Sequence, residues 1–283
     1  MFDLFVRTAA ECSKNVTQTY STSFSLGIRT LHKRFRAPIY AIYGMVRCAD
    51  EIVDTFHQFD KKYLLEKFRQ DTFEAIDKGI SLNPILFSFQ KVVNEYHIPL
   101  DLIEAFFKSM ETDLYETAYG QAGYEDYIYG SAEVVGLMCL RVFAEGDKEM
   151  YNGLEKYARA LGAAFQKVNF LRDMGSDHDE RGRIYFPGID FAHFKEDSKR
   201  QIEAEVAEDF RAAYEGIMLL PEGAKGGVWL AYRYYLSLFH RIRKVSVAEL
   251  RDTRVSVPDM QKFYILFSTV AHRQLRFSLS GAH

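Results

Sequence analysis

The chain has 283 residues, a formal net charge of -3, 48% hydrophobic residues and 27% charged residues. This composition is ordinary for a globular protein, and the small negative charge argues against a nucleic-acid partner because no positive surface field is expected. Three cysteines (Cys12, Cys48 and Cys139) are too few and too far apart for a disulfide framework or a cysteine zinc site, which favours a reducing cytosol.

The first half of the chain has the pattern of helices separated by prolines and polar residues. Its start, residues 1–5, carries an acid where a signal peptide needs basic residues. Pro38 predicts a helix over 38–56, since proline is well tolerated at the first helical position. A further helix is predicted over 84–96, and Pro99 opens the next.

The second half continues the helical pattern. The segment 125–144 is apolar with few breaks, and Gly146 precedes a long helix. Three more helices are predicted near 195–219, 225–249 and 257–278. No alternating strand pattern occurs, and no run approaches the about 20 apolar residues of a membrane span. The chain is therefore predicted to be all-α, with about eight to ten helices in one domain, 1–283. We expect it in the cytoplasm; peripheral membrane contact and the oligomeric state remain open.

Two pairs of aspartates share one spacing: Asp50 with Asp54, and Asp173 with Asp177. On a helix, residues four apart point from the same face, one turn from each other. A chain with 39 acidic residues will contain several such pairs by chance, so the spacing alone decides nothing.

Each pair extends a narrow polar stripe on an otherwise apolar helix. The first stripe steps by four, three and four residues through Tyr43, Arg47, Asp50 and Asp54. The second steps by three, four and four through Gln166, Asn169, Asp173 and Asp177. Carboxylates among apolar neighbours are costly unless they are paired or bind a metal. The two stripes therefore predict two walls of one internal metal site.

The donor types indicate which metal is expected. Carboxylate and amide oxygens suit Mg²⁺ or Mn²⁺. A helical di-iron site needs Glu-x-x-His pairs, and none of the eight histidines follows a glutamate at that spacing. No EF-hand pattern occurs either.

Basic and aromatic residues suggest what the metal would bind. Mg²⁺ held by few protein carboxylates commonly shares its coordination with substrate phosphate, and Arg47, Arg172, Arg181 and Arg183 lie near the stripes in sequence. We expect residues 178–187 to form a loop beside the site. Because there is no Walker A or G-x-G-x-x-G pattern, a nucleotide is improbable. The chain also has 23 Phe and 18 Tyr, so most of these rings pack in the core while some line a cavity that suits an apolar or cationic ligand.

The chain resembles the squalene/phytoene synthase family. The matching segments are 20–24 (YSTSF), 41–54 (AIYGMVRCADEIVD), 127–136, 161–177 and 183–187 (RIYFP). The resemblance runs from about residue 15 to about residue 260. It implies an α-helical isoprenoid synthase fold and a prenyltransferase that joins two prenyl diphosphates head to head.

The resemblance also implies roles for single residues. Mg²⁺ bridged to the substrate diphosphates would be held by Asp50, Asp54, Asn169, Asp173 and Asp177, with Gln166 in support. Diphosphate binding and substrate orientation would fall to Arg47, Tyr43, Ser21, Ser23, Phe24, Arg183 and Tyr185. Tyr235 and Arg254 would close the site from the C-terminal helices, and Tyr129, Val135 and Gly136 would line the substrate channel.

Two departures from the family pattern bear on the product. The frequent Ala-Gly-Thr-Val-Gly run stands here as Ala-Glu-Val-Val-Gly at 132–136, and Thr22 replaces the basic residue between the two serines. The expected reaction is condensation of two geranylgeranyl diphosphates to phytoene through prephytoene diphosphate, in carotenoid biosynthesis and without NADPH. The alternatives are a C30 reaction, in which farnesyl diphosphate gives dehydrosqualene, presqualene diphosphate or (with NADPH) squalene, and a non-catalytic relative.

Overall fold

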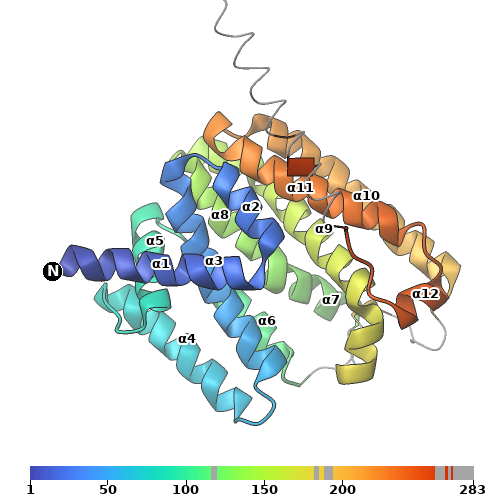
Figure 1. Ribbon diagram of the computed structural model, residues 1–283, viewed down its shortest axis with the longest axis horizontal. Coiled ribbons are helices and arrows are strands. Elements are labelled where there is room, and N and C mark those ends of the chain that lie inside the picture. The colour runs from blue at the N-terminus through green and yellow to red at the C-terminus, as the bar shows by residue number, and fades with distance from the viewer. Residues whose placement is uncertain (116–119, 182–184, 188–193, 259–264, 267–268, 270–283) are drawn as a thin grey trace, which may run out of the picture.

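The computed structural model describes residues 1–115, 120–181, 185–187, 194–258, 265–266 and 269, of which 176–181 are described by main chain only. These residues form twelve α-helices and one π-helical segment and contain no strand (Figure 1). The predicted all-α class is therefore confirmed. The predicted number of helices was too low, because the helices Phe2–Tyr20, Thr22–Thr30 and Lys61–Lys78 had not been predicted and Val247–Asp252 had not been separated from the helix before it.

The first six helices are α1 (Phe2–Tyr20), α2 (Thr22–Thr30), α3 (Lys33–Thr55), α4 (Lys61–Lys78), α5 (Pro84–Tyr96) and α6 (Leu100–Thr112). Polar side chains mark several of their starts, as helix capping requires. Ser21 caps α2 by accepting a hydrogen bond from the backbone N–H of Phe24 at 3.2 Å, and Asn83 caps α5 in the same way. The prediction for 84–96 matches α5.

Pro38 does not open its helix, contrary to the prediction from its position. Helix α3 begins five residues earlier, at Lys33, and contains Pro38 in its second turn. The ring of His32 accepts from the backbone N–H of Arg34, and Phe35 is fully buried. Burial of this phenylalanine favours helix upstream of the proline. Pro38 is the sixth helical residue, beyond the first four backbone N–H groups that have no intrahelical partner, so it removes one helical hydrogen bond, a cost that the burial of Phe35 helps to offset.

The second half contains α7 (Gln121–Ile128), a π-helix η1 (Tyr129–Glu133), α8 (Val134–Ala144), α9 (Lys148–Arg181), α10 (Glu196–Leu219), α11 (Glu222–Ile242) and α12 (Val247–Asp252). Two predictions need correction. The segment 225–249 is divided between α11 and α12, and the expected loop over 178–187 is helical as far as Arg181. The predicted helix over 257–278 lies largely outside the described residues.

The apolar segment 125–144 belongs to a continuous helical run, Gln121–Ala144, and the most apolar 18-residue window of this run has a mean hydropathy of 1.3. This run is long and apolar enough to cross a membrane, so the expectation that no segment approaches such a span was wrong. However, 56% of its most apolar window is buried within the protein. That burial is typical of a helix at the centre of a bundle.

Two groups of buried side chains hold the bundle together. One lies among α2–α6, α8 and the start of α9, and the other among α7, the rest of α9, α10, α11 and α12. Figure 1 shows α4 and α5 at one side of the molecule and α10, α11 and α12 at the other, with α3, α8 and α9 between them. The long helix α9 contributes to both groups, so it fixes the position of one relative to the other.

Candidate active site

A cavity of about 550 Å³ lies between α3, the end of α6, the α7–η1 junction and α9. Nine of the residues singled out from the sequence line it: Arg47, Asp50, Asp54, Gln166, Asn169, Arg172, Asp173, Tyr185 and Arg254. Three residues of each polar stripe thus face one space, although the stripes are more than 100 residues apart in sequence. This is the arrangement expected of two walls of a single site.

The first wall is the polar face of α3. Arg47, Asp50 and Asp54 point into the cavity, while Ala49 and Val53 on the same helix are buried. The guanidinium of Arg47 is paired with Glu51 and lies 4.5 Å from the ring centre of Tyr20. The arginine is therefore held in place on the edge of the wall by a carboxylate and an aromatic ring.

Negative charge accumulates on this wall. Burial first, and then the neighbouring carboxylates of Asp54 and Asp113, raise the pKa of Asp50 to about 7 against the opposing effect of Arg47. Enclosed like charges destabilise one another unless a proton or a cation offsets them. The α3 wall therefore favours the binding of a positively charged species.

The second wall is the polar face of α9, where arginines surround the aspartate. Arg172 donates to Asp173 from Nε at 2.9 Å, and Nε of Arg254 lies 2.7 Å from Oδ1 of the same carboxylate. Burial tends to raise the pKa of Asp173, but these two guanidinium groups outweigh burial and hold the pKa below its usual range. Asp177 lies one turn further along α9, where only the main chain is described, and Arg183 lies outside the described residues.

An aromatic cluster stands beside the cavity and supports Asn169. The Tyr235 hydroxyl donates to Oδ1 of Asn169 at 3.4 Å, and its ring stacks on Phe165 with centroids 3.9 Å apart. The ring of Phe24 contacts both Tyr235 and Tyr43. Tyr43, Phe24 and Tyr235 are thus brought together, one layer behind the cavity surface.

Burial raises the pKa of Tyr43 to about 12, so this phenol stays protonated, and its hydroxyl is hydrogen-bonded to the Ser21 side chain. Ser21 itself caps α2, and Ser23 lies within that helix. Neither serine lines the cavity. Their assignment to substrate remains a prediction.

The predicted channel residues Tyr129, Val135 and Gly136 do not line the cavity either. Tyr129 lies at the start of η1, with Arg159 5.1 Å from its ring centre. A Cβ added at Gly136 would stand 2.7 Å from the carbonyl oxygen of Ala158, so this glycine allows α8 and α9 to approach closely. The role of Gly136 as a channel residue remains a prediction.

Asp113 was missed by the sequence analysis, which assigned no role in the site to Tyr127, the first residue of the matching segment 127–136. Asp113 is buried at the C-terminal end of α6, lines the cavity and accepts a hydrogen bond from the Tyr127 hydroxyl at Oδ2, 2.9 Å away. The Tyr127 ring packs against Phe170 and Tyr185, which stack on each other with centroids 4.0 Å apart. The only signal in the sequence was a lone acid after an apolar helix, which is too common to single out.

The donor set fits magnesium whose coordination is completed by a ligand. Within the described part of the chain, no three acidic, histidine or cysteine side chains lie close enough to form a complete metal cage. Instead, carboxylate and amide oxygens stand on facing walls as Asp50, Asp54, Asn169 and Asp173. Mg²⁺ is commonly held in this way, by one or two carboxylates from the protein together with substrate phosphates.

Comparison with known proteins agrees with this geometry. The profile of the squalene/phytoene synthase family matches residues 17–261. The chain is 30% identical to a 4,4'-diapophytoene synthase from Staphylococcus haemolyticus, over 69% of this chain and 67% of the relative. It is 26% identical to a phytoene synthase from Arthrospira platensis, over 90% of each.

Solved structures show the same fold. A dehydrosqualene synthase crystallised with a ligand superposes with a TM-score of 0.79 at 19% identity, covering 95% of this chain and 98% of that one. A squalene synthase from Alicyclobacillus acidocaldarius gives a TM-score of 0.72 at 20% identity, covering 84% and 94%. Since the family profile spans most of the chain and both aspartate segments face one cavity, the chain belongs to the squalene/phytoene synthase family, a family of prenyltransferases that join prenyl diphosphates head to head.

Proposed function

We propose that the protein condenses two molecules of geranylgeranyl diphosphate to phytoene, through prephytoene diphosphate, in the presence of Mg²⁺. The observation that carries this proposal is the convergence of Asp50, Asp54 and Asp173 on one cavity that also contains arginines and aromatic rings. Acidic groups alone would repel a diphosphate. With Mg²⁺ and arginines between them, the same groups bind it.

Each wall would contribute differently to diphosphate binding. Bound Mg²⁺ would neutralise the diphosphate and make it a better leaving group. Arg47 on α3, and Arg172 and Arg254 beside Asp173, would donate hydrogen bonds to the phosphate oxygens. Asn169, held by Tyr235, is oriented to present its amide toward the same space.

The aromatic rings that line the cavity would shield the carbocation intermediates from water. Loss of the first diphosphate leaves an allylic cation, which the double bond of the second substrate attacks, and loss of one proton closes the cyclopropane. Loss of the second diphosphate starts the rearrangement, and loss of a second proton gives phytoene. Tyr127, Phe170 and Tyr185 would exclude water and stabilise positive charge with their ring faces.

A C30 reaction is the second candidate. It is supported by the 30% identity to a 4,4'-diapophytoene synthase and by the fold of a dehydrosqualene synthase. In this reaction farnesyl diphosphate would give dehydrosqualene, presqualene diphosphate or, with NADPH, squalene. The chemistry at the aspartates would be the same, and only the length of the apolar chain would differ.

The deciding experiment incubates the purified protein and Mg²⁺ with each prenyl diphosphate separately, with and without NADPH, and identifies the products by mass spectrometry. We expect phytoene from geranylgeranyl diphosphate without NADPH. A C30 product from farnesyl diphosphate, with no C40 product or intermediate from geranylgeranyl diphosphate, would replace the first proposal by the second. Activity on neither substrate would contradict both.

A further inference from the structure

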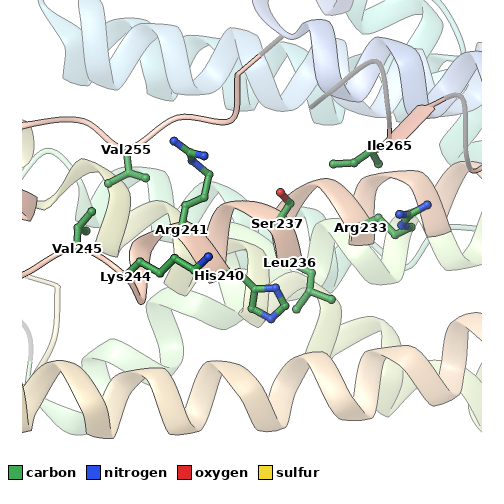
Figure 2. Close-up of a pocket in the computed structure, with 9 residues that line it drawn as sticks. All are labelled: Arg233, Leu236, Ser237, His240, Arg241, Lys244, Val245, Val255 and Ile265. Atoms are coloured by element: carbon green, nitrogen blue, oxygen red, sulfur yellow. The ribbon is translucent and has the colours of Figure 1, made fainter. Parts of the chain in front are cut away.

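A second pocket, of about 530 Å³, lies on the face of α11 that points away from the active-site cavity. Helix α11 buries Tyr235, Leu238 and Phe239 on its inner face. Its outer face, together with residues from the chain that follows, lines the pocket shown in Figure 2. The volume is within the range of small-molecule sites.

Basic side chains dominate the polar part of this pocket. Arg233, His240, Arg241 and Lys244 line it, and no acidic residue is among the described residues of the lining. In Figure 2, Arg241 and Ser237 rise from α11 towards the level of Val255 and Ile265. A concave surface with several cations and no carboxylate concentrates positive potential and attracts anions.

Two of these basic side chains lack an ion-pair partner in the described part of the chain. Arg241 and Lys244 form no ion pair with any described residue, whereas nearby Arg243 lies 3.8 Å from Glu203. Partial burial first, and then the charges of Arg243 and Lys244, lower the pKa of His240. Neighbouring positive charge thus disfavours protonation of His240, as expected in a pocket lined by several basic side chains.

The other side of the pocket is apolar. Leu236, Val245, Val255 and Ile265 contribute aliphatic surface, and Ile265 is buried. An inorganic anion alone would leave this surface without a partner. The pairing of cations with aliphatic walls instead matches a molecule with a charged head and a hydrocarbon body.

We propose that this outer pocket binds a phosphate or diphosphate group carried on an apolar chain. Arg241 and Lys244 would contact the phosphate oxygens, Ser237 would donate a hydrogen bond, and the apolar chain would lie against Leu236 and Val255. Such a molecule has two sources, a soluble lipid phosphate or the headgroup of an acidic membrane lipid. The pocket is separate from the aspartate-lined cavity and does not depend on its activity.

The test uses the full chain in EDTA, so that binding that requires Mg²⁺ in the aspartate-lined cavity is suppressed. Dodecyl phosphate serves as the soluble probe in calorimetric titrations, with dodecanol as the uncharged control. Vesicles of phosphatidylglycerol, compared with vesicles of phosphatidylcholine, serve as the membrane probe in sedimentation. The variant Arg241→Gln/Lys244→Gln is compared with Arg200→Gln/Arg211→Gln, which removes two exposed arginines from α10.

We expect saturable binding of the soluble probe or the acidic vesicles, weakened about 30-fold in the α11 variant, since each basic residue near a phosphate surface contributes about 1 kcal/mol. The α10 variant and Asp50→Ala/Asp173→Ala should bind as the unaltered protein does. If the α11 variant loses binding of dodecyl phosphate alone, the ligand is a soluble lipid phosphate. If it loses binding of the acidic vesicles alone, the ligand is a membrane headgroup. Equal binding by the α11 and α10 variants, or no saturable binding to either probe, would overturn the proposal, with circular dichroism verifying that all variants are folded.

Discussion

Asp50 and Asp173 belong to pairs with the same spacing, yet they occupy opposite electrostatic surroundings on facing walls of one cavity. Burial and the neighbouring carboxylates of Asp54 and Asp113 raise the pKa of Asp50 to about 7. Two arginines overcome the effect of burial at Asp173 and lower its pKa. The α3 wall therefore has an excess of negative charge, while the α9 wall already contains its own cations.

Because of this difference, we expect the α3 wall to contribute mainly to metal binding and the α9 wall to contribute arginines to diphosphate binding. The raised pKa of Asp50 reflects burial and like charge around it, so this carboxylate gains more from a bound metal ion than Asp173 does. Asp173 is already paired with Arg172 and Arg254. A diphosphate that enters the cavity would therefore compete with Asp173 for the same two guanidinium groups. Variants that remove groups from one wall at a time test whether the two walls differ in this way.

The largest effect is expected when both walls lose an aspartate. The variant Asp50→Ala/Asp173→Ala should lower the rate of product formation from geranylgeranyl diphosphate at least about 1,000-fold, because metal and diphosphate binding fail together. Helical content by circular dichroism should be unchanged. The control Asp77→Ala/Asp197→Ala removes two exposed carboxylates and should retain full activity. Retained activity in the first variant would show that the metal assignment is wrong.

Arg254→Gln tests the cations of the α9 wall. Loss of the guanidinium 2.7 Å from Asp173 should lower kcat/KM about 10- to 100-fold, the usual range for a group that supports a ligand. Steady-state kinetics measure the effect. Arg243→Gln removes an arginine from the end of α11 and serves as the control, with kcat/KM expected to stay unchanged. Equal losses of kcat/KM in Arg254→Gln and Arg243→Gln would mean that surface charge in general, and not the contact with Asp173, causes the loss.

Asp113→Asn tests the excess negative charge of the α3 wall. Replacing this carboxylate by an amide of the same shape removes one of the charges acting on Asp50 and should weaken divalent-metal affinity about tenfold. Titration with Mn²⁺, followed by electron paramagnetic resonance, measures the affinity. Tyr127→Phe removes the hydrogen-bond donor to Asp113 but leaves the charge of Asp113 in place. The loss of Mn²⁺ affinity in Tyr127→Phe should therefore be smaller. Unchanged Mn²⁺ affinity in Asp113→Asn would contradict a role for this charge.

The smallest effect is expected on stability, from the close packing of α12 beside the α9 wall. A Cβ at Gly175 would stand 2.1 Å from the carbonyl oxygen of Arg251, so Gly175→Ala should destabilise the fold by about 1–3 kcal/mol. Gly153 lies on the same helix with no atom within 4 Å of an added Cβ, and Gly153→Ala should stabilise by about 0.5–1 kcal/mol. Urea unfolding measures both. A stable Gly175→Ala variant would mean that α12 moves freely against α9.

Much of this architecture follows from local patterns in the sequence. The 3.6-residue period predicted most helices, and the i,i+4 spacing placed Asp50 with Asp54, and Asp173 with Asp177, on single helix faces. Local patterns also misled at Pro38, where burial of Phe35 extends α3 upstream of the proline. They did not predict η1 either, because a π-helical turn depends on what packs against it.

The helical class, the two polar stripes and the family were evident from the amino-acid sequence, because these depend on residues near one another in the chain or on motifs. The position of residues from both stripes on one cavity, and the different charges around Asp50 and Asp173, depend instead on how distant helices pack. Asp113 reaches the site because α6 ends beside Asp50, and Gly130 allows η1 to approach Ala105 on α6 closely. Arg254 reaches Asp173 from 81 residues away. A pKa depends on every charge within a few ångströms, and those neighbours are assembled only when distant helices pack together.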